Sequence, residues 1–194
     1  MDLSKFFESE LEEHTQVANA TRVSLSGAFT TLVNRCSDVL RAGNKVLFFG
    51  NGGSAADCQH IATELTVRYK TDRKAIAAIA LTTDTSALTA IGNDFGFDQL
   101  FARQIEALGN PGDVAIGIST SGQSENVIKA LRIAKDMGLT AAGLSGRGGG
   151  RMVGIADPLL IVPSDTTARI QEMHIMLGQM LCGALEIELG LVMP

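Results

Sequence analysis

The sequence predicts an α/β fold in which a doubly wound, parallel sheet of five strands is covered by helices on both faces. From Lys45 onward, short apolar runs alternate with helical patterns, and each run is continuously apolar. Continuous apolarity indicates strands that are covered on both faces, as in parallel sheets. With 194 residues, 45% of them hydrophobic, the chain is expected to form a single domain over residues 1–194.

The N-terminal segment, residues 4–41, is expected to form two helices that pack as a hairpin and extend the domain within an oligomer. In its second half, apolar side chains recur at steps of three and four residues and form one stripe. Ala42-Gly43-Asn44 ends this pattern, because glycine is the usual residue after the C-terminus of a helix.

The strands are expected at residues 45–49, 75–81, 114–118, 140–144 and 159–162, and the helices between and after them at 54–69, 98–108, 125–137 and 167–189. The last helix has few polar residues in its middle, and a helix that is apolar all round must be buried all round. One sheet cannot cover it completely. A second subunit is therefore expected to cover the rest, and the chain is expected to form a homo-oligomer.

Composition and charge exclude several classes of function. The net charge of −5 argues against binding nucleic acid through a broad basic surface, and no apolar run approaches the roughly 18 residues of a membrane span. The N-terminus lacks the apolar stretch of a signal peptide. Cys36, Cys58 and Cys182 are widely spaced and odd in number, which favours buried, reduced thiols in a cytoplasmic protein.

Two turns rich in small residues follow expected strands and precede expected helices. The first supplies Asn51, Gly52, Gly53 and Ser54, and the second supplies Ser119, Thr120, Ser121 and Ser124. Unpaired backbone N–H groups at a helix start bind phosphate, and small side chains let it approach. In doubly wound sheets both turns lie at the carboxyl ends of the strands, where they converge. Either turn alone is weak evidence, because glycine and serine also simply make turns. Neither turn has the sequence of a P-loop or of a dinucleotide site, so a sugar phosphate fits better than a nucleotide.

Four further groups of polar residues are candidates for chemistry. His60 and Glu64 lie four residues apart on one helix face, where they could hold a divalent metal, where the carboxylate could act as a base, or where both are simply solvated. Gln171 and Gln179 interrupt the apolar last helix, and buried amides need partners. The same helix carries His174, for which a bond to a loop or to a neighbouring subunit is favoured. Asn93 and Asp94 either cap the following helix or bind hydroxyl groups.

Five motifs occur in order along the chain: Gly50-Asn-Gly-Gly-Ser54, Glu64-Leu-Thr-Val-Arg-Tyr69, Gly92-Asn-Asp-Phe-Gly96, Gly117-Ile-Ser-Thr-Ser-Gly122 and Arg169-Ile-Gln-Glu-Met-His174. In these motifs the chain resembles the phosphoheptose isomerase family, whose sugar isomerase (SIS) fold is flavodoxin-like. The resemblance implies a cytoplasmic homotetramer with sites between subunits. It also implies conversion of sedoheptulose 7-phosphate to D-glycero-D-manno-heptose 7-phosphate, an early step toward ADP-heptose and the lipopolysaccharide core.

The resemblance also implies roles for individual residues. Ser54, Ser119, Thr120, Ser121 and Ser124 would hold the phosphate, and Asn51, Gly52, Gly53, Asn93 and Asp94 would contact the sugar or shape its pocket. His60, Glu64 and Gln171 match ligands of zinc and substrate. Glu64 matches the carboxylate that moves a proton between C1 and C2 through an enediol, a reaction that also needs stabilisation of charge on the carbonyl oxygen.

Gln179 departs from this pattern, because the family places a histidine there that binds the metal and transfers protons. An amide does not titrate near neutral pH, and zinc prefers imidazole, thiolate and carboxylate ligands. Three explanations fit: an engineered inactivating substitution, a natural variant with another proton relay, or a relative that no longer isomerises. The alternative function is that of a non-catalytic SIS tetramer that binds the replication initiator protein DnaA. Retention of Glu64 and of the Asn-Gly-Gly-Ser turn favours the enzyme.

Overall fold

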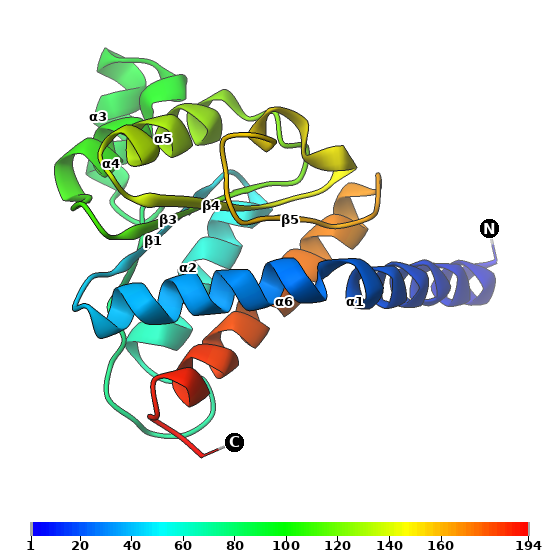
Figure 1. The fold of residues 1–194 in the computed structure, drawn as a ribbon. Coiled ribbons are helices and arrows are strands. Elements are labelled where there is room, and N and C mark those ends of the chain that lie inside the picture. The colour runs from blue at the N-terminus through cyan, green and yellow to red at the C-terminus, as the bar shows by residue number, and fades with distance from the viewer. Residues whose placement is uncertain (1, 194) are drawn as a thin grey trace.

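A computed structural model describes residues 2–193, and these residues form one parallel sheet of five strands between two layers of helices (Figure 1). The strands are β1 (Val46–Gly50), β2 (Ala78–Ala80), β3 (Val114–Ser119), β4 (Thr140–Ser145) and β5 (Leu159–Ile161). Their order in the sheet is β2-β1-β3-β4-β5, and every neighbouring pair is parallel. The predicted fold class is therefore confirmed.

The sheet order places a topological switch point between β1 and β3. The chain leaves β1 toward β2 on one side, and it leaves β3 toward β4 and β5 on the other. Ligands of doubly wound sheets bind outside the carboxyl ends of the strands at such a point. The two candidate phosphate turns follow β1 and β3, so both lie at this position.

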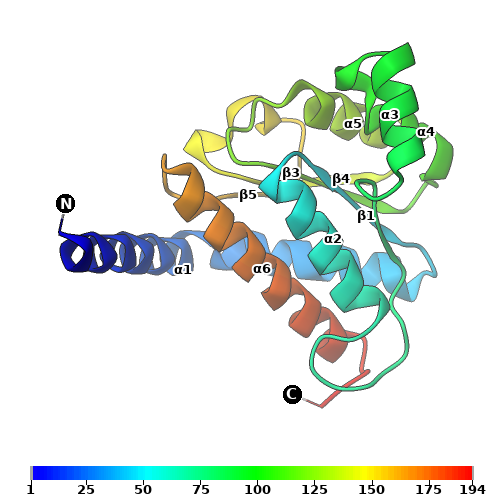
Figure 2. The ribbon, with the colours of Figure 1, turned by 180° about the vertical axis from the view of Figure 1, so that it is seen from behind.

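Each face of the sheet carries its own layer of helices (Figure 2). One layer contains α1 (Leu3–Arg41), α2 (Gly53–Thr66) and α6 (Thr167–Glu188), and the other contains α3 (Thr85–Asp94), α4 (Ala102–Leu108) and α5 (Glu125–Asp136). Alternate residues of a strand point to opposite faces. Val46 and Phe48 of β1 accordingly pack in the core beneath α1, α2 and α6, whereas Leu47 and Phe49 pack in the core beneath α4 and α5.

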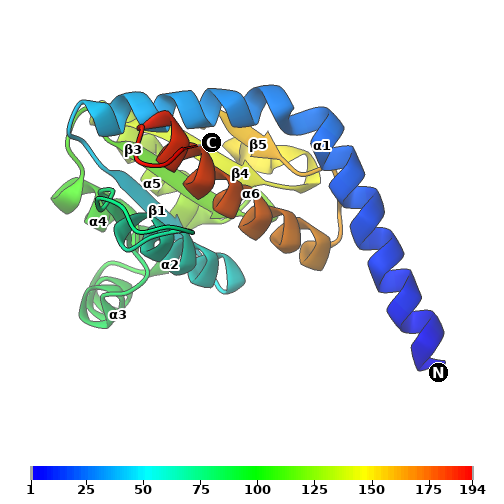
Figure 3. The same ribbon diagram turned by 90° about the horizontal axis from the view of Figure 1, so that it is seen from below.

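The expected N-terminal hairpin is wrong, because residues Leu3–Arg41 form one helix of 39 residues. The Asp2 side chain accepts hydrogen bonds from the backbone N–H groups of Ser4 and Lys5 and caps its start. Gly27 is the one glycine inside it, and a single glycine costs only about 1 kcal/mol relative to alanine. No proline or glycine pair breaks the chain between the two expected helices. Figure 3 shows the N-terminal half of α1 projecting beyond the sheet.

The segment between β2 and β3 also differs from expectation. The helix expected at 98–108 is a short 3-10 turn, Phe97–Gln99, followed by α4, and helix α3 precedes both. None of the residues Thr85–Asp94, all of them described, is fully buried, and only Leu88 and Ile91 pack partly against the core, so the apolar signal of α3 in the sequence is short. The strand expected at 75–81 is limited to Ala78–Ala80, because this edge strand pairs only with β1.

None of the helices within residues 2–193 is both long enough and apolar enough to cross a membrane. The thiols of Cys36, Cys58 and Cys182 are free and buried, as the sequence predicts. Burial raises the pKa of Cys36 and Cys182 to about 12, so both remain protonated and behave as small apolar side chains.

Candidate active site

A reciprocal pair of amides joins the two candidate phosphate turns. The Asn51 Nδ2 group donates to Asn126 Oδ1 over 2.9 Å, and the Asn126 Nδ2 group donates to Asn51 Oδ1 over 2.8 Å. Asn51 follows β1, and Asn126 lies in the first turn of α5, directly after the second turn. The predicted convergence of the two turns is therefore confirmed. Sequence reasoning missed Asn126, because its partner is distant along the chain.

The second turn, residues 119–124, presents hydroxyl groups at the start of α5. Ser119 Oγ and Ser124 Oγ lie 3.0 Å apart, and the Ser121 hydroxyl accepts a hydrogen bond from the Gln123 N–H. Gly122 has a φ of +64°, and a Cβ on it would lie 2.1 Å from the Gly149 carbonyl oxygen. The turn thus needs glycine at this position and is supported from behind by the loop Arg147–Met152.

The first turn brings the backbone of α2 against a side chain of α6. Gly52 precedes α2 with a φ of +56°, and a Cβ on Gly53 would lie 2.4 Å from Gln171 Nε2. Glycine at position 53 therefore lets Gln171 lie at the N-terminus of α2, as the predicted site requires. Ser54 is buried, with 3% of its surface exposed, and forms the floor of the turn beside Gly50.

A cavity of 410 Å³ opens beside the first turn, between α2 and α3. Asn51, Gly52 and Ala55 line it from one side. From the other side it is lined by residues that sequence reasoning did not single out, namely Thr82, Leu88, Thr89, Phe97, Leu100 and Phe101. Thr82 directly follows the expected strand 75–81, and its place at a strand's carboxyl end is the signal that could have found it.

Glu64 and its neighbours form a second, shallower cavity of 280 Å³ farther along α2, lined by Gln59, His60, Thr63 and Glu64. His60 Nε2 lies 3.2 Å from Glu64 Oε1, and the same nitrogen lies 3.5 Å from Gln179 Nε2 of α6. The two helices approach closely at Gly178, where a Cβ would lie 2.3 Å from Ile61 Cδ1. The structure thus brings three of the four predicted metal-site residues together.

The distance between His60 and Glu64 suits two ligands of one zinc ion, but the chemistry of the whole donor set does not. Zinc holds nitrogen and oxygen ligands at about 2.0–2.2 Å in a tetrahedron, which sets neighbouring donors about 3.3 Å apart. Of the predicted ligands, only His60 and Glu64 are of the kinds that zinc prefers, and Gln171 and Gln179 are neutral amides. Within residues 2–193, no group of three or more His, Cys, Asp and Glu side chains could hold a metal ion. The donor set therefore does not fit a tightly held zinc ion, and zinc binding stays a prediction.

Asn93 and Asp94 do not join the cavity in this structure. Both are exposed at the end of α3, and the Asn93 amide donates to Asp94 Oδ1 over 2.7 Å. The cavity wall includes the preceding residue, Gly92. Their predicted contact with the sugar stays a prediction.

His174 and Asp57 are two further titratable residues near the site. His174 Nε2 donates to the Ser145 carbonyl oxygen over 3.1 Å, and burial lowers the pKa of this imidazole to about 4. His174 is thus a neutral structural residue that is hydrogen-bonded to the end of β4. The sequence favours such a structural hydrogen bond. Asp57 lies one turn before His60, and its Oδ2 is buried without a hydrogen-bond partner in residues 2–193. Burial raises the pKa of Asp57, and the nearby His60 partly opposes this shift.

The sheet order, the paired turns at the switch point and the helix that carries Glu64 together define a sugar isomerase (SIS) domain. The SIS domain family model matches residues 11–146. The chain is 60% identical to the phosphoheptose isomerase of Paramagnetospirillum magneticum, over 96% of this chain and 97% of that protein. It belongs to the phosphoheptose isomerase family.

Solved structures agree with this assignment. The phosphoheptose isomerase of Neisseria gonorrhoeae superposes with a TM-score of 0.90 at 42% identity, covering 95% of this chain and 99% of that one. The phosphoheptose isomerase of Francisella tularensis gives a TM-score of 0.93 at 35% identity, covering 96% and 100%. Both likenesses extend over α1, which confirms that the long N-terminal helix is part of the shared fold.

Proposed function

We propose that this chain converts sedoheptulose 7-phosphate to D-glycero-D-manno-heptose 7-phosphate, the early step toward ADP-heptose and the lipopolysaccharide core. One observation carries the proposal. The amide pair of Asn51 and Asn126 fixes two phosphate-type turns at the switch point, and the helix that starts at the first turn carries Glu64. The relatives named above are phosphoheptose isomerases over nearly their full lengths.

In the proposed complex the second turn holds the phosphate group. The Ser119, Ser121 and Ser124 hydroxyls and the backbone N–H groups at the start of α5 would donate to its oxygens. A helix N-terminus favours an anion through its orphan N–H groups and its dipole. The phosphate would thus fix one end of the sugar at the switch point, and Gln171 beside Gly53 would contact the chain.

Glu64 would then act at the other end of the sugar. At 1.5 Å per residue, Gly53 to Glu64 spans about 16 Å along the axis of α2, and the Glu64 side chain leans back toward the start of the helix. The carboxylate would take a proton from C1 of the ketose and return it to C2 of the enediol, while the proton of the O1 hydroxyl passes to O2, and both transfers together give the aldose. His60, 3.2 Å away, holds the carboxylate in place. Charge on the carbonyl oxygen must also be stabilised during this transfer.

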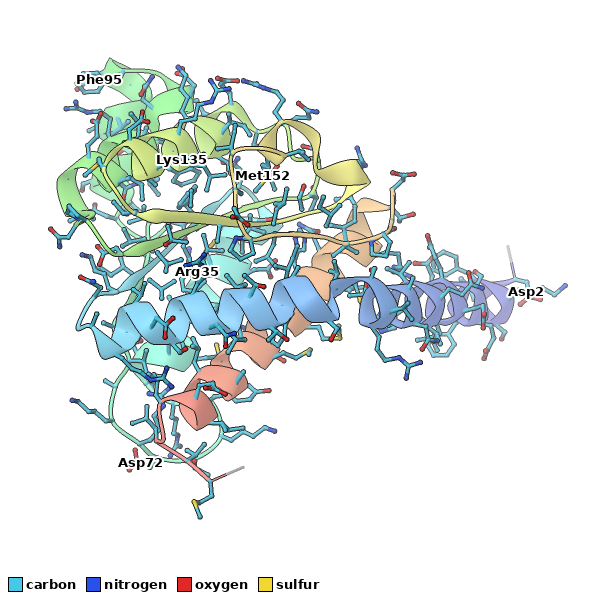
Figure 4. The ribbon with its side chains drawn as sticks, in the orientation of Figure 1. Asp2, Arg35, Asp72, Phe95, Lys135 and Met152 are labelled. Atoms are coloured by element: carbon cyan, nitrogen blue, oxygen red, sulfur yellow. The ribbon has the colours of Figure 1, made fainter. Side chains whose placement is uncertain are left out.

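We further propose that the sites lie between subunits of a cytoplasmic homotetramer. Four large apolar side chains of the projecting half of α1 are exposed, namely Leu3, Phe6, Phe7 and Leu11. Figure 4 places Asp2, just before them, at the end of α1 that is farthest from the sheet. A groove of 440 Å³ between α1 and α6 continues this surface and includes the half-exposed Met180, one residue after Gln179. Exposed apolar surface of this kind is typical of subunit interfaces.

Incubation of the purified protein with sedoheptulose 7-phosphate tests the proposed function, with formation of the aldose followed by nuclear magnetic resonance. Product formation supports it. If no product forms with or without added divalent ions, while the protein captures the replication initiator, the non-catalytic alternative is correct.

A further inference from the structure

Gln179 occupies the place beside His60 and Glu64 where a third metal ligand would stand. Its Nε2 lies 3.5 Å from His60 Nε2, and His60 Nε2 lies 3.2 Å from Glu64 Oε1. Two ligands of one tetrahedral zinc ion are about 3.3 Å apart. His60 and Glu64 therefore have the spacing of two ligands of one zinc ion, and an amide lies beside them.

The amide offers hydrogen bonds to His60 in place of a metal bond. When the His60 Nε2 atom carries no proton, it accepts from the Gln179 N–H group, and when it carries one, it donates to Glu64 Oε1 instead. An amide nitrogen has no lone pair available for a metal, and a neutral amide oxygen binds zinc more weakly than imidazole or carboxylate does. Gln179 thus competes with Glu64 for the same ring nitrogen and adds no strong metal ligand.

The backbone fixes the position of this side chain. Gly178 lets α6 lie against Ile61 of α2, where any Cβ on residue 178 would lie 2.3 Å from Ile61 Cδ1. One turn farther along α6, the Cys182 thiol contacts the Ile61 carbonyl oxygen at 3.7 Å. Residues 178 and 182 thus hold α6 against α2 on either side of residue 179. A substitution at position 179 should therefore change the chemical group beside His60 and leave the position of the backbone unchanged.

We propose that Gln179 keeps this site free of a tightly held zinc ion, and that histidine at this one position creates a zinc site. The chain then carries a weak, exchangeable cation site in which hydrogen bonds, and not a resident ion, hold His60 beside Glu64. This proposal rests on the proposed function only in treating the cavity at His60 and Glu64 as the active site. Its test does not depend on that function, because zinc binding is measured without substrate.

Zinc affinity, measured by competition with a chromophoric chelator on metal-stripped protein, tests the proposal. Gln179→His is expected to bind one zinc ion per chain at least about 100-fold more tightly than the unsubstituted protein, since even supporting residues around a metal change its affinity 10- to 100-fold. Gln16→His is the matched control. Gln16 lies four residues after Glu12 on an exposed face of α1 and donates to Glu12 Oε1 over 2.8 Å. This control creates a His–Glu pair of the same spacing without a second imidazole nearby, and it should gain no tight site.

Equally tight zinc binding by the unsubstituted protein and by Gln179→His would overturn the proposal, and so would an equal gain in Gln16→His. Gln179→Ala provides a second measurement that does not depend on whether Gln179→His folds. Because the amide is a weak ligand, its removal should change zinc affinity by less than about threefold. A loss of more than about tenfold would show that the amide is a true ligand. Absence of isomerase activity in every variant counts against the proposed function and leaves the zinc result unaffected.

Discussion

Asn51 and Asn126 exchange two hydrogen bonds, of 2.9 and 2.8 Å, and thereby tie the turn after β1 to the start of α5. Asn126 is 2% exposed, and its Oδ1 also accepts from the backbone N–H of Val127. This amide is therefore fully engaged within the protein. The two turns are held in register before any ligand arrives, which is the preorganisation that binding and catalysis require.

Asn51→Ala should lower kcat/KM for sedoheptulose 7-phosphate by about 100-fold, because a small displacement of positioning groups is enough for such a loss. It should also lower the free energy of unfolding by about 1–3 kcal/mol, since it leaves the buried Asn126 amide without its partner. Steady-state kinetics and urea unfolding measure both effects. The Asn51→Ala/Asn126→Ala double variant should lose less than the sum of the two single losses. Strictly additive losses would show that the two amides do not act as a pair.

Gly178→Ala should lower the free energy of unfolding by about 1–3 kcal/mol, because its Cβ would overlap the buried Ile61 side chain. Gly27→Ala is the matched control, since Gly27 also lies inside a helix and nothing lies within 4 Å of its added Cβ. This control should raise the free energy of unfolding by about 0.5–1 kcal/mol. Urea unfolding of the two variants measures the difference. Equal stabilities would contradict the close approach of α2 and α6.

The pH dependence of stability should contain a contribution from His174. Its pKa is about 4 in the folded chain and about 6.5 in an unfolded one, so between these values only the unfolded state takes up the proton. The free energy of unfolding should fall as the pH drops through this window, by about 1 kcal/mol per pH unit at most. In His174→Gln, which retains a donor for the Ser145 carbonyl, this part of the slope should vanish. Urea unfolding across the window measures it, and an unchanged slope would show that His174 is protonated in the fold.

Charge on the projecting half of α1 should weaken the proposed homotetramer. Phe6 and Phe7 are 51% and 61% exposed, and a charged side chain at either position would oppose burial against a second subunit. Phe7→Lys should therefore shift the mass measured by light scattering toward smaller species. Glu8→Lys, which also adds a positive charge at a neighbouring exposed position, is the control and should have a smaller effect. Equal masses for Phe7→Lys and the unsubstituted protein would place the interface elsewhere.

The sheet could be predicted from the sequence because its strands are buried on both faces. The continuous apolar runs at β1, β3 and β4 predict buried strands, and strands that are buried on both faces predict a parallel sheet. Helix α3 is difficult to predict, because its apolar signal is limited to Leu88 and Ile91, which are only partly buried. The two helices expected within residues 4–41 are a single helix, α1, because neither a proline nor a pair of glycines interrupts this segment.

Site residues could be predicted where the residues that form a motif lie close together in the sequence. The two turns and the spacing of His60 and Glu64 belong to this kind, and the structure brings each group together. Asn126 and Thr82 were missed, because their contacts with Asn51 and with the cavity join segments that are distant along the chain. The same reason applies to Gly178, whose role depends on Ile61 of another helix.

The proposed proton-transfer role of Glu64 is tested most directly by running the isomerisation in deuterium oxide with the unsubstituted protein and with Glu64→Gln. We predict that the unsubstituted protein forms the aldose with deuterium at C2, because the carboxylate exchanges its proton with solvent. Glu64→Gln should lower kcat by about 10²–10⁴-fold, since the amide cannot accept the proton. Aldose formation at an equal rate by both proteins would contradict the account.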